Sequence, residues 1–196
     1  MVDENNTKIR ILEATWHLME TQQGKGVTMS AIAKEAGISR QALYLHFDSR
    51  IKMIIATVNY VDEVKGLNER LKEFQIETTG IKLLEASIDV WGNYIPEIYG
   101  IAKAMLNTRN SDEATNIAWN ECMAGLRSVC QKTIETLDKE KQLAPNWTIE
   151  TATQMYWTII SIHNWEQLTV DCGWSTNEYI NRMKIVLKNA FIKSHQ

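Results

Sequence analysis

Two polar side chains near residue 40 have the chemistry to recognise the edges of DNA bases. Arg40 carries paired N–H donors that match guanine O6 and N7, and Gln41 offers a donor and an acceptor that match adenine N6 and N7. Tyr44 follows Arg40 by one helical turn, so its hydroxyl would lie on the same side. Such recognition requires that these side chains face outward from a rigid element.

The residues around these side chains predict two short helices joined by a tight turn. Thr28 is a suitable N-cap for the first helix, and Gly37 can adopt the positive φ that ends it. Ser39 would cap the second helix, on which Leu43 and Phe47 share one buried side. The pattern predicts a helix-turn-helix whose second helix enters the major groove of DNA, and a plain helical corner is the alternative.

Residues 28–50 resemble the DNA-binding signature of the TetR family of one-component bacterial transcription regulators. The matching elements are Thr28, Ile32-Ala33, Ala36-Gly37-Ile38-Ser39, Tyr44-Leu45-His46-Phe47 and Asp48-Ser49-Arg50. Arg50-Ile51 departs from the more usual Lys-Glu, but arginine keeps the charge, so the phosphate contact implied there would survive. The resemblance covers about the first 55 residues. It implies that these residues contact DNA: Thr28, Ser39, Arg40, Gln41, Tyr44, His46 and Arg50.

The composition predicts an all-α protein. The chain has 196 residues, 44% apolar and 23% charged, with only two prolines and little alternation of β-branched residues. Helical periodicity indicates about nine helices, three of them in an N-terminal helix-turn-helix domain. We expect a DNA-binding domain over residues 1–50 and a larger effector-binding and dimerisation domain over residues 51–196.

Three features of the predicted helices bear on how the DNA-binding part connects to the remainder. Apolar residues at helical spacing predict one long helix from about residue 49 to 71, in which Gly66 could be a soft point. Pro96 is expected to break a helix or to open the next one. A single helix is predicted from Thr148 to about Val170.

The charge distribution does not by itself indicate nucleic-acid binding. The net charge is −3, while residues 1–60 hold seven Lys/Arg and six Asp/Glu, so the remainder carries −4. Because phosphate contacts depend on local charge, a DNA-binding role remains compatible with these numbers. We expect modest non-specific affinity and a strong dependence on dimer geometry.

The cysteines and the hydropathy pattern predict a cytoplasmic protein. Cys122, Cys130 and Cys172 form no CxxC pair, and their odd number without a signal peptide argues for a reducing compartment. Burial as small apolar residues is favoured over redox sensing. No apolar run approaches the roughly 20 residues that span a membrane, and no cofactor motif is present.

The larger part is rich in aromatic residues and is predicted to bind a small hydrophobic or aromatic effector. Six of the seven tryptophans lie beyond residue 90, and aromatic-lined spaces between helices are common ligand sites. For any single ring, an ordinary core position or a dimer contact is the alternative. The predicted effector-binding residues are Trp91, Tyr94, Met105, Trp119, Met123 and Trp157.

In proteins that this sequence resembles, the last two helices pair with their copy in a second chain. Two apolar stripes would form a four-helix bundle across a two-fold axis and place two reading helices about 34 Å apart on a palindromic operator. The predicted interface residues are Met155, Ile159, Ile162, Ile180, Met183 and Leu187.

The favoured function is a ligand-released repressor that binds double-stranded DNA as a homodimer. An enzyme or metal-binding protein using His163 and Glu166, which stand at i and i+3, is a second hypothesis with an incomplete ligand set. A DNA-binding dimer without an effector is a third. The sequence names neither the effector nor the operator, and an activator remains an alternative to a repressor.

Overall fold

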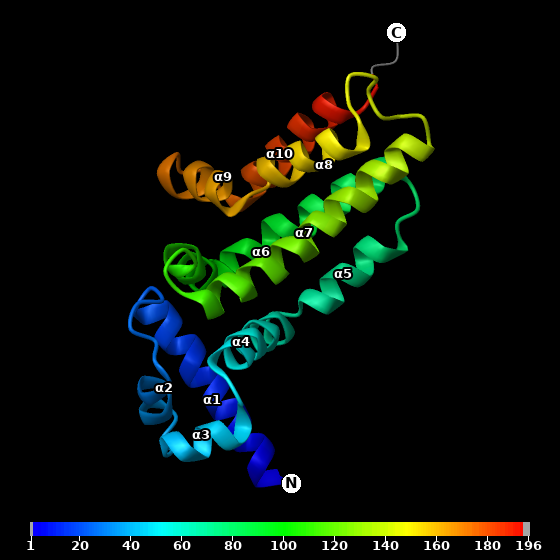
Figure 1. The fold of residues 1–196 in the computed structure, drawn as a ribbon. Helices are drawn as coiled ribbons and strands as arrows, with labels where there is room; N and C mark the ends of the chain where they lie inside the picture. The colour runs from blue at the N-terminus through cyan, green and yellow to red at the C-terminus, as the bar shows by residue number, and fades with distance from the viewer. Residues whose placement is uncertain (1, 194–196) are drawn as a thin grey trace. The chain divides into compact units, whose positions relative to one another are not determined.

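The computed structural model describes the backbone of residues 2–193 and the side chains of residues 5–72 and 74–193. Within this described part the regular structure is helical, and the only β-pairing is one isolated bridge between Leu143 and Ile192. The predicted all-α class is therefore confirmed (Figure 1). The elements are α1 (Val2–Thr21), α2 (Met29–Glu35), α3 (Arg40–His46), α4 (Arg50–Val64), α5 (Leu67–Ile76), α6 (Gly80–Thr108), α7 (Glu113–Lys139), α8 (Ile149–Ile159), α9 (Ile162–Glu166), the π-helical segment η1 (Gln167–Asp171) and α10 (Thr176–Phe191).

The long helix predicted from residue 49 to 71 is two helices. α4 ends at Val64, Gly66 adopts a φ of +68°, and α5 begins at the next residue. This left-handed conformation is accessible to glycine at no steric cost, so the glycine ends the helix instead of softening it. The single helix predicted after Thr148 is also interrupted, because Ser161 caps a new helix after α8 has ended.

The predicted break at Pro96 is wrong, because α6 continues through it without interruption. Proline removes one backbone N–H donor from a helix. The two residues before it, Tyr94 and Ile95, are buried. We attribute the continuity to this packing, which offsets the lost hydrogen bond.

The chain forms two compact units. Unit 1 consists of Met1–Gly66 and Glu97–Cys122, and unit 2 consists of Leu67–Pro96 and Met123–Gln196. Thus α6 and α7 each contribute one end to either unit. Since compactness and function need not divide a chain at the same place, the functional division at residue 50 stays a prediction.

Unit 1 is built around α1, which packs against α2 and α4, while α2 packs against α3. Its core is mainly aliphatic, with the rings of Phe47 and Trp119, and includes Ile11, Met19, Ile32, Leu43, Met53 and Ile54. Unit 2 buries larger rings beside aliphatic residues, among them Leu84, Ile88, Ile134, Tyr156, Tyr179, Leu187 and Phe191. Each unit therefore has its own hydrophobic core.

Candidate nucleic-acid interface

The helix-turn-helix forms as its caps predict. The Thr28 hydroxyl accepts a hydrogen bond from the Ala31 amide at 3.2 Å, and the Ser39 hydroxyl accepts one from the Ala42 amide at 3.0 Å. Between them Gly37 has a φ of +66°. These local bonds satisfy amides that a short helix leaves unpaired at its start.

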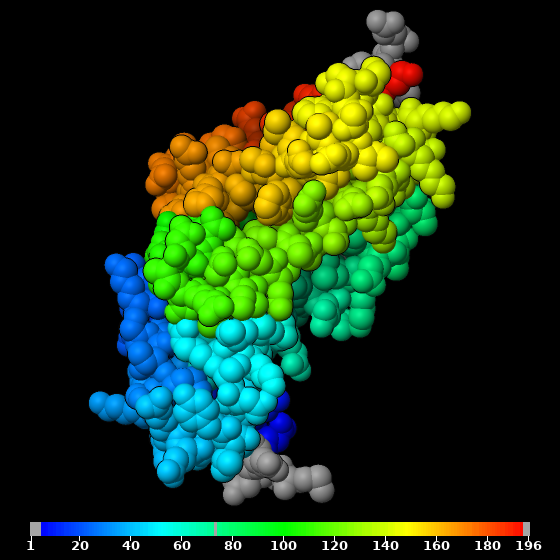
Figure 2. All heavy atoms as spheres, viewed as in Figure 1, coloured from blue at the N-terminus to red at the C-terminus, as the bar shows by residue number. Residues whose placement is uncertain are grey.

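The inner side of α3 is buried and its outer side faces solvent. Leu43 is fully buried, whereas Arg40, Gln41, Tyr44 and Leu45 are exposed. In Figure 2 the pale blue and cyan atoms of this part of the chain lie at the molecular surface. The outward orientation of Arg40, Gln41 and Tyr44 therefore agrees with the sequence prediction, and their contact with DNA stays a prediction.

Arg40 and Tyr44 are paired with each other on this surface. The Arg40 Nη2 atom donates to the Tyr44 hydroxyl at 3.5 Å, and the guanidinium carbon lies 5.7 Å from the ring centroid. A cation over an aromatic face is held there electrostatically. Gln41 and Leu45 are the other exposed residues on the outer side of α3.

The remaining predicted DNA contacts differ in accessibility. Thr28 and Ser39 use their hydroxyl oxygens as helix caps, but a hydroxyl can still donate its proton to a phosphate. His46 is half-buried in the last turn of α3. These three side chains frame the outer face of α3, and none of them points to base recognition by itself.

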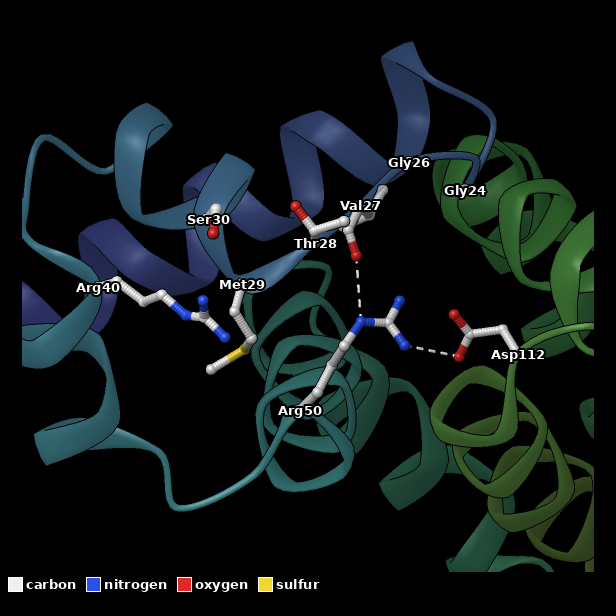
Figure 3. Close-up of a pocket in the computed structure, with 9 residues that line it drawn as sticks. All are labelled: Gly24, Gly26, Val27, Thr28, Met29, Ser30, Arg40, Arg50 and Asp112. Atoms are coloured by element: carbon white, nitrogen blue, oxygen red, sulfur yellow. Dashed lines mark hydrogen bonds and ion pairs between the residues drawn. The ribbon is translucent and has the colours of Figure 1, made fainter.

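Arg50, which the sequence assigns to a phosphate, is engaged inside unit 1. Its Nε donates to the Val27 carbonyl at 3.1 Å, and its Nη1 lies 2.6 Å from the Asp112 carboxylate (Figure 3). Asp112 also accepts from the Thr115 amide at 2.9 Å and so caps α7. The charge of Arg50 is therefore paired within unit 1 in this structure, and its contact with a phosphate stays a prediction.

The electrostatics of this pair favour the ionised carboxylate. Partial burial raises the pKa of Asp112, but hydrogen bonds from Arg50 and Thr115 and the charge of Arg50 outweigh burial. The net pKa lies below the ordinary value of 3.8. Asp112 was not predicted from the sequence, because it is separated from Arg50 by 62 positions. The local signal for it was its spacing from Thr115, which fits an N-cap.

A pocket of about 390 Å³ opens beside this pair. Arg40 reaches it from α3 and Arg50 from the start of α4, as Figure 3 shows. The lining residues are Gly24, Gly26, Val27, Thr28, Met29, Ser30, Arg40, Arg50 and Asp112. The pocket therefore joins residues of the helix-turn-helix to the cap of α7 within unit 1.

The loop before α2 is held against the end of α6. Gly24 has a φ of +78°, and a Cβ atom at this position would lie 2.6 Å from the Ala104 carbonyl oxygen. The side chain of Thr108 would be 2.9 Å from the same atom. Only glycine permits this approach, because both the conformation and the space exclude a side chain.

The six predicted effector-binding residues are divided between the two units. Met105 and Trp119 belong to unit 1 and are buried there, and the Arg109 guanidinium lies 5.2 Å from the Trp119 ring centroid. The other four, Trp91, Tyr94, Met123 and Trp157, belong to unit 2. Of these, Trp91 donates from its indole N–H to the Ile160 carbonyl at 2.6 Å. Their role in binding an effector stays a prediction.

Unit 2 holds several buried hydroxyl groups. Tyr156 is hydrogen-bonded to Ser87, and burial raises the pKa of Tyr156 well above 10. The Tyr179 hydroxyl and the Thr153 hydroxyl are also buried, and neither has a hydrogen-bond partner among the described residues. Because a buried polar group without a partner costs about 1–3 kcal/mol, these two groups are notable features of the core.

Two of the three cysteines have raised pKa values. Burial raises the pKa of the Cys130 thiol to about 12. Burial, followed by the charges of Asp62 and Glu121, raises that of Cys122 to about 12. A thiol that stays protonated is a weak nucleophile, which agrees with these two residues acting as small apolar groups.

The six predicted dimer-interface residues differ in exposure, and their contact with a second chain stays a prediction. Ile162, Ile180, Met183 and Leu187 are buried inside their own chain, so these side chains have almost no surface left for a partner. The other two predicted residues keep surface: Met155 is 42% exposed and Ile159 is half-buried.

The apolar surface of α10 lies on its other side. Ile185 is 54% exposed and Val186 is 44% exposed. Helical periodicity identified an apolar stripe correctly but could not tell that this stripe packs within the chain.

His163 and Glu166 lie on α9, and His163 is exposed. Across the described residues, no group of three or more His, Cys, Asp or Glu side chains is placed to hold a metal ion. Over the same part of the chain, no helix is both long and apolar enough to cross a bilayer.

The N-terminal segment is similar in sequence to known proteins. Residues 11–57 match the model of the bacterial regulatory proteins of the tetR family. The nucleoid occlusion factor SlmA of Marinomonas sp. (strain MWYL1) is 35% identical over 60 residues, which are 31% of this chain and 30% of that protein. SlmA of Alteromonas mediterranea is 32% identical over 62 residues, 32% of each chain. The chain thus matches these curated relatives over about a third of their length.

Solved structures resemble nearly the whole chain. A candidate transcriptional regulator from Saccharomonospora viridis in complex with choline has a TM-score of 0.75 at 14% identity, covering 97% of this chain and 100% of that one. The transcriptional regulator FadR from Bacillus subtilis in complex with stearoyl-CoA gives 0.73 at 17%, covering 93% and 98%. A TetR transcription regulator from Haloarcula marismortui gives 0.69 at 17%, covering 96% and 100%. At these identities the likeness establishes a shared fold.

The sequence match falls on the segment that forms the capped helix-turn-helix, and the fold match extends over the helices that follow it. The N-terminal segment is thus similar to the tetR family of bacterial regulatory proteins, and the whole chain shares its fold with a TetR transcription regulator.

Proposed function

We propose that this chain is a TetR-family transcription regulator that binds a palindromic operator as a homodimer and represses transcription until a small effector releases it. The observation that carries the proposal is the outer face of α3, where Arg40 and Gln41 are exposed on a helix capped by Ser39. Both residue types form bidentate hydrogen bonds with base edges in the major groove. The caps hold that face in one orientation before DNA arrives.

In this proposal the phosphate contacts come from residues that frame α3. Thr28, Ser39 and Tyr44 each offer a hydroxyl proton, and His46 offers a ring nitrogen. Arg50 can reach a phosphate only if it gives up its bond to Asp112. Arg50 therefore contributes to DNA affinity only when its bond to Asp112 is broken.

We assign the dimer contact to the outer faces of α8 and α10. Met155 on α8 and Ile185 and Val186 on α10 supply exposed apolar surface. A two-fold pairing of these helices would be self-complementary and would present two α3 helices to half-sites about 34 Å apart. The functional division at residue 50 belongs to the same proposal.

The proposed effector is a small hydrophobic or aromatic molecule bound beyond residue 50. Support comes from the aromatic side chains of that part and from two proteins of similar fold whose structures hold choline and stearoyl-CoA. In unit 2, the buried Tyr179 and Thr153 hydroxyls pair with no described residue and are the polar groups that we propose for an effector. Trp91, Tyr94, Met105, Trp119, Met123 and Trp157 remain the predicted contacts.

Operator binding is tested with the full-length protein. Selection from random duplexes would identify the operator, and Arg40→Ala and Gln41→Ala should each weaken binding about 5- to 100-fold and relax the preference at one base pair. Arg127→Ala and Gln131→Ala, which remove an exposed arginine and an exposed glutamine from α7, are the matched controls. Unchanged affinity and unchanged base preference in both α3 variants would contradict the assignment.

Effector release is tested separately on the protein–operator complex. Stearoyl-CoA and choline are the first probes, with intrinsic tryptophan fluorescence reporting binding and operator anisotropy reporting release. A compound that quenches fluorescence and releases the operator supports the ligand-released repressor. Binding of the operator that no compound in a wider hydrophobic and aromatic panel alters would favour a dimer without an effector.

A further inference from the structure

Among the described residues, Leu45 is the most solvent-exposed of the large apolar side chains. It is 87% exposed, on α3, directly beside Tyr44. Isolated exposed leucines are common on protein surfaces and need no explanation by themselves. What sets Leu45 apart is its position on the outer face of a helix whose neighbouring side chains suit base recognition.

The geometry of α3 places Leu45 beside Gln41 and opposite the core. Gln41 and Leu45 stand two residues before and two residues after Leu43, which is fully buried. At about 100° per residue, both lie roughly 160–200° from Leu43 and about 40° from each other. These two side chains therefore point most directly away from the core of unit 1.

Arg40 and Tyr44 occupy the flank of the same helix. At about 100° per residue they lie roughly 60–100° from Leu43, and they hydrogen-bond to each other. From this flank the long Arg40 side chain can still reach a base edge, whereas the Tyr44 hydroxyl is nearer the DNA backbone. Gln41 and Leu45, which point most directly away from the core, are the pair best placed to meet base edges.

The chemistry of a leucine restricts what it can recognise in the major groove. It can form no hydrogen bond, and the only apolar group that a base edge presents there is the C5 methyl of thymine. A protein surface would be the other apolar partner. Gln41 and Tyr44 are polar neighbours of Leu45 on α3, so the apolar area is too small to favour protein docking.

We infer that Leu45 is a specificity-determining residue that contacts a thymine C5 methyl group beside the base read by Gln41. The inference rests on the proposed DNA-binding function. One helical turn separates the two residues by about 6 Å along the helix, and base pairs are about 3.4 Å apart. The thymine therefore lies one or two base pairs from the adenine that pairs with Gln41.

The test removes the methyl group from the DNA and the leucine from the protein. Each thymine of the selected operator is replaced by uracil, symmetrically in both half-sites, and affinity is measured for the full-length wild type and for Leu45→Ala. Wild type should lose about four-fold per half-site at one thymine, the factor expected for one buried methyl group. Leu45→Ala should be indifferent to uracil at that position and should accept other bases there.

Ile76→Ala is the matched control, because Ile76 is a 75% exposed aliphatic residue on α5. It should keep the wild-type response to every uracil, and all three proteins should melt at the same temperature. If Leu45→Ala keeps the wild-type response to uracil at every position, the inference is overturned, whether or not overall affinity falls. If wild type prefers no sequence at all, the proposed function itself fails and the inference falls with it.

Discussion

Two amphipathic helices, α3 in unit 1 and α10 in unit 2, bury one face and leave apolar side chains on the other. On α3 the exposed Leu45 stands among Arg40, Gln41 and Tyr44, three side chains with directional hydrogen-bonding groups. On α10 the exposed apolar residues are the adjacent Ile185 and Val186. Both outer faces therefore carry apolar groups, and the main difference is in the side chains that surround these groups.

This difference indicates that the side chains around an exposed apolar group, and not its area alone, determine which kind of partner the surface fits. A surface with several oriented donors around one aliphatic group fits the mixed polar and methyl pattern of a DNA groove. A surface with contiguous aliphatic groups fits the centre of a protein interface. Both observations support the proposal that α3 contacts DNA and that the outer face of α10 contacts a second copy of the chain.

The largest expected effects come from truncating the inner faces of the two helices. Leu43→Ala and Leu187→Ala should each lower the free energy of unfolding by about 2–5 kcal/mol, because both side chains are fully buried. Leu45→Ala, on the outer face of α3, should change it by no more than about 0.5 kcal/mol. Urea unfolding of the three variants measures the difference. Equal losses for Leu43→Ala and Leu45→Ala would contradict the two-faced description of α3.

The next effect concerns the outer face of α10. Ile185→Asp should raise the dimer dissociation constant about 10- to 100-fold, because dimerisation would bury an unpaired carboxylate. Sedimentation at micromolar concentrations measures the monomer fraction. Ile76→Asp is the control, since it adds the same charge at an exposed aliphatic position on α5. A fully dimeric Ile185→Asp protein would exclude this face from the interface.

A smaller effect separates the two states of Arg50. Asp112→Asn removes its charged partner, while asparagine can still cap α7. The released guanidinium should tighten operator binding about three- to ten-fold and make the dependence on salt steeper by about one phosphate contact per chain. Anisotropy titrations at several salt concentrations measure both quantities. Weaker binding in Asp112→Asn would show instead that the pair holds the helix-turn-helix in its binding shape.

The same variant gives a pH dependence of stability. The pKa of Asp112 in the folded chain lies below its ordinary value of 3.8, so the pair stabilises the fold above that value. This contribution, about 1 kcal/mol, is lost as the pH falls through the folded-state pKa. Wild type should therefore exceed Asp112→Asn in stability by a constant margin above about pH 5, and the margin should shrink below about pH 4. Urea unfolding between pH 3 and 7 measures the margin.

The sequence was informative wherever the decisive contacts are local. Thr28, Gly37 and Ser39 act within three residues of themselves, so residue type and spacing sufficed to predict both short helices. Their local chemistry also placed Arg40 and Gln41 on the outer face. Leu45 could have been found from the same spacing, because it follows the buried Leu43 by two residues.

Sequence reasoning was insufficient wherever a contact joins distant parts of the chain. The partner of Arg50 lies 62 positions away, and the helix through Pro96 depends on the burial of its neighbours. Periodicity likewise identifies an apolar stripe without telling whether it packs within the chain or against another one. Ile180, Met183 and Leu187 illustrate this ambiguity, because they are buried in unit 2 while their role in an interface stays a prediction.

Gly24 has a consequence for how this protein can change over evolutionary time. Its α-carbon rests against the Ala104 carbonyl and Thr108, four residues before the cap that begins α2. In a saturation library selected for operator binding, position 24 should be recovered as glycine alone, as invariant as a residue that contacts a base. Invariance of position 24 would then reflect the close contact of two backbone segments within unit 1. Related proteins could change their operator preference through substitutions in α3 while this glycine is kept.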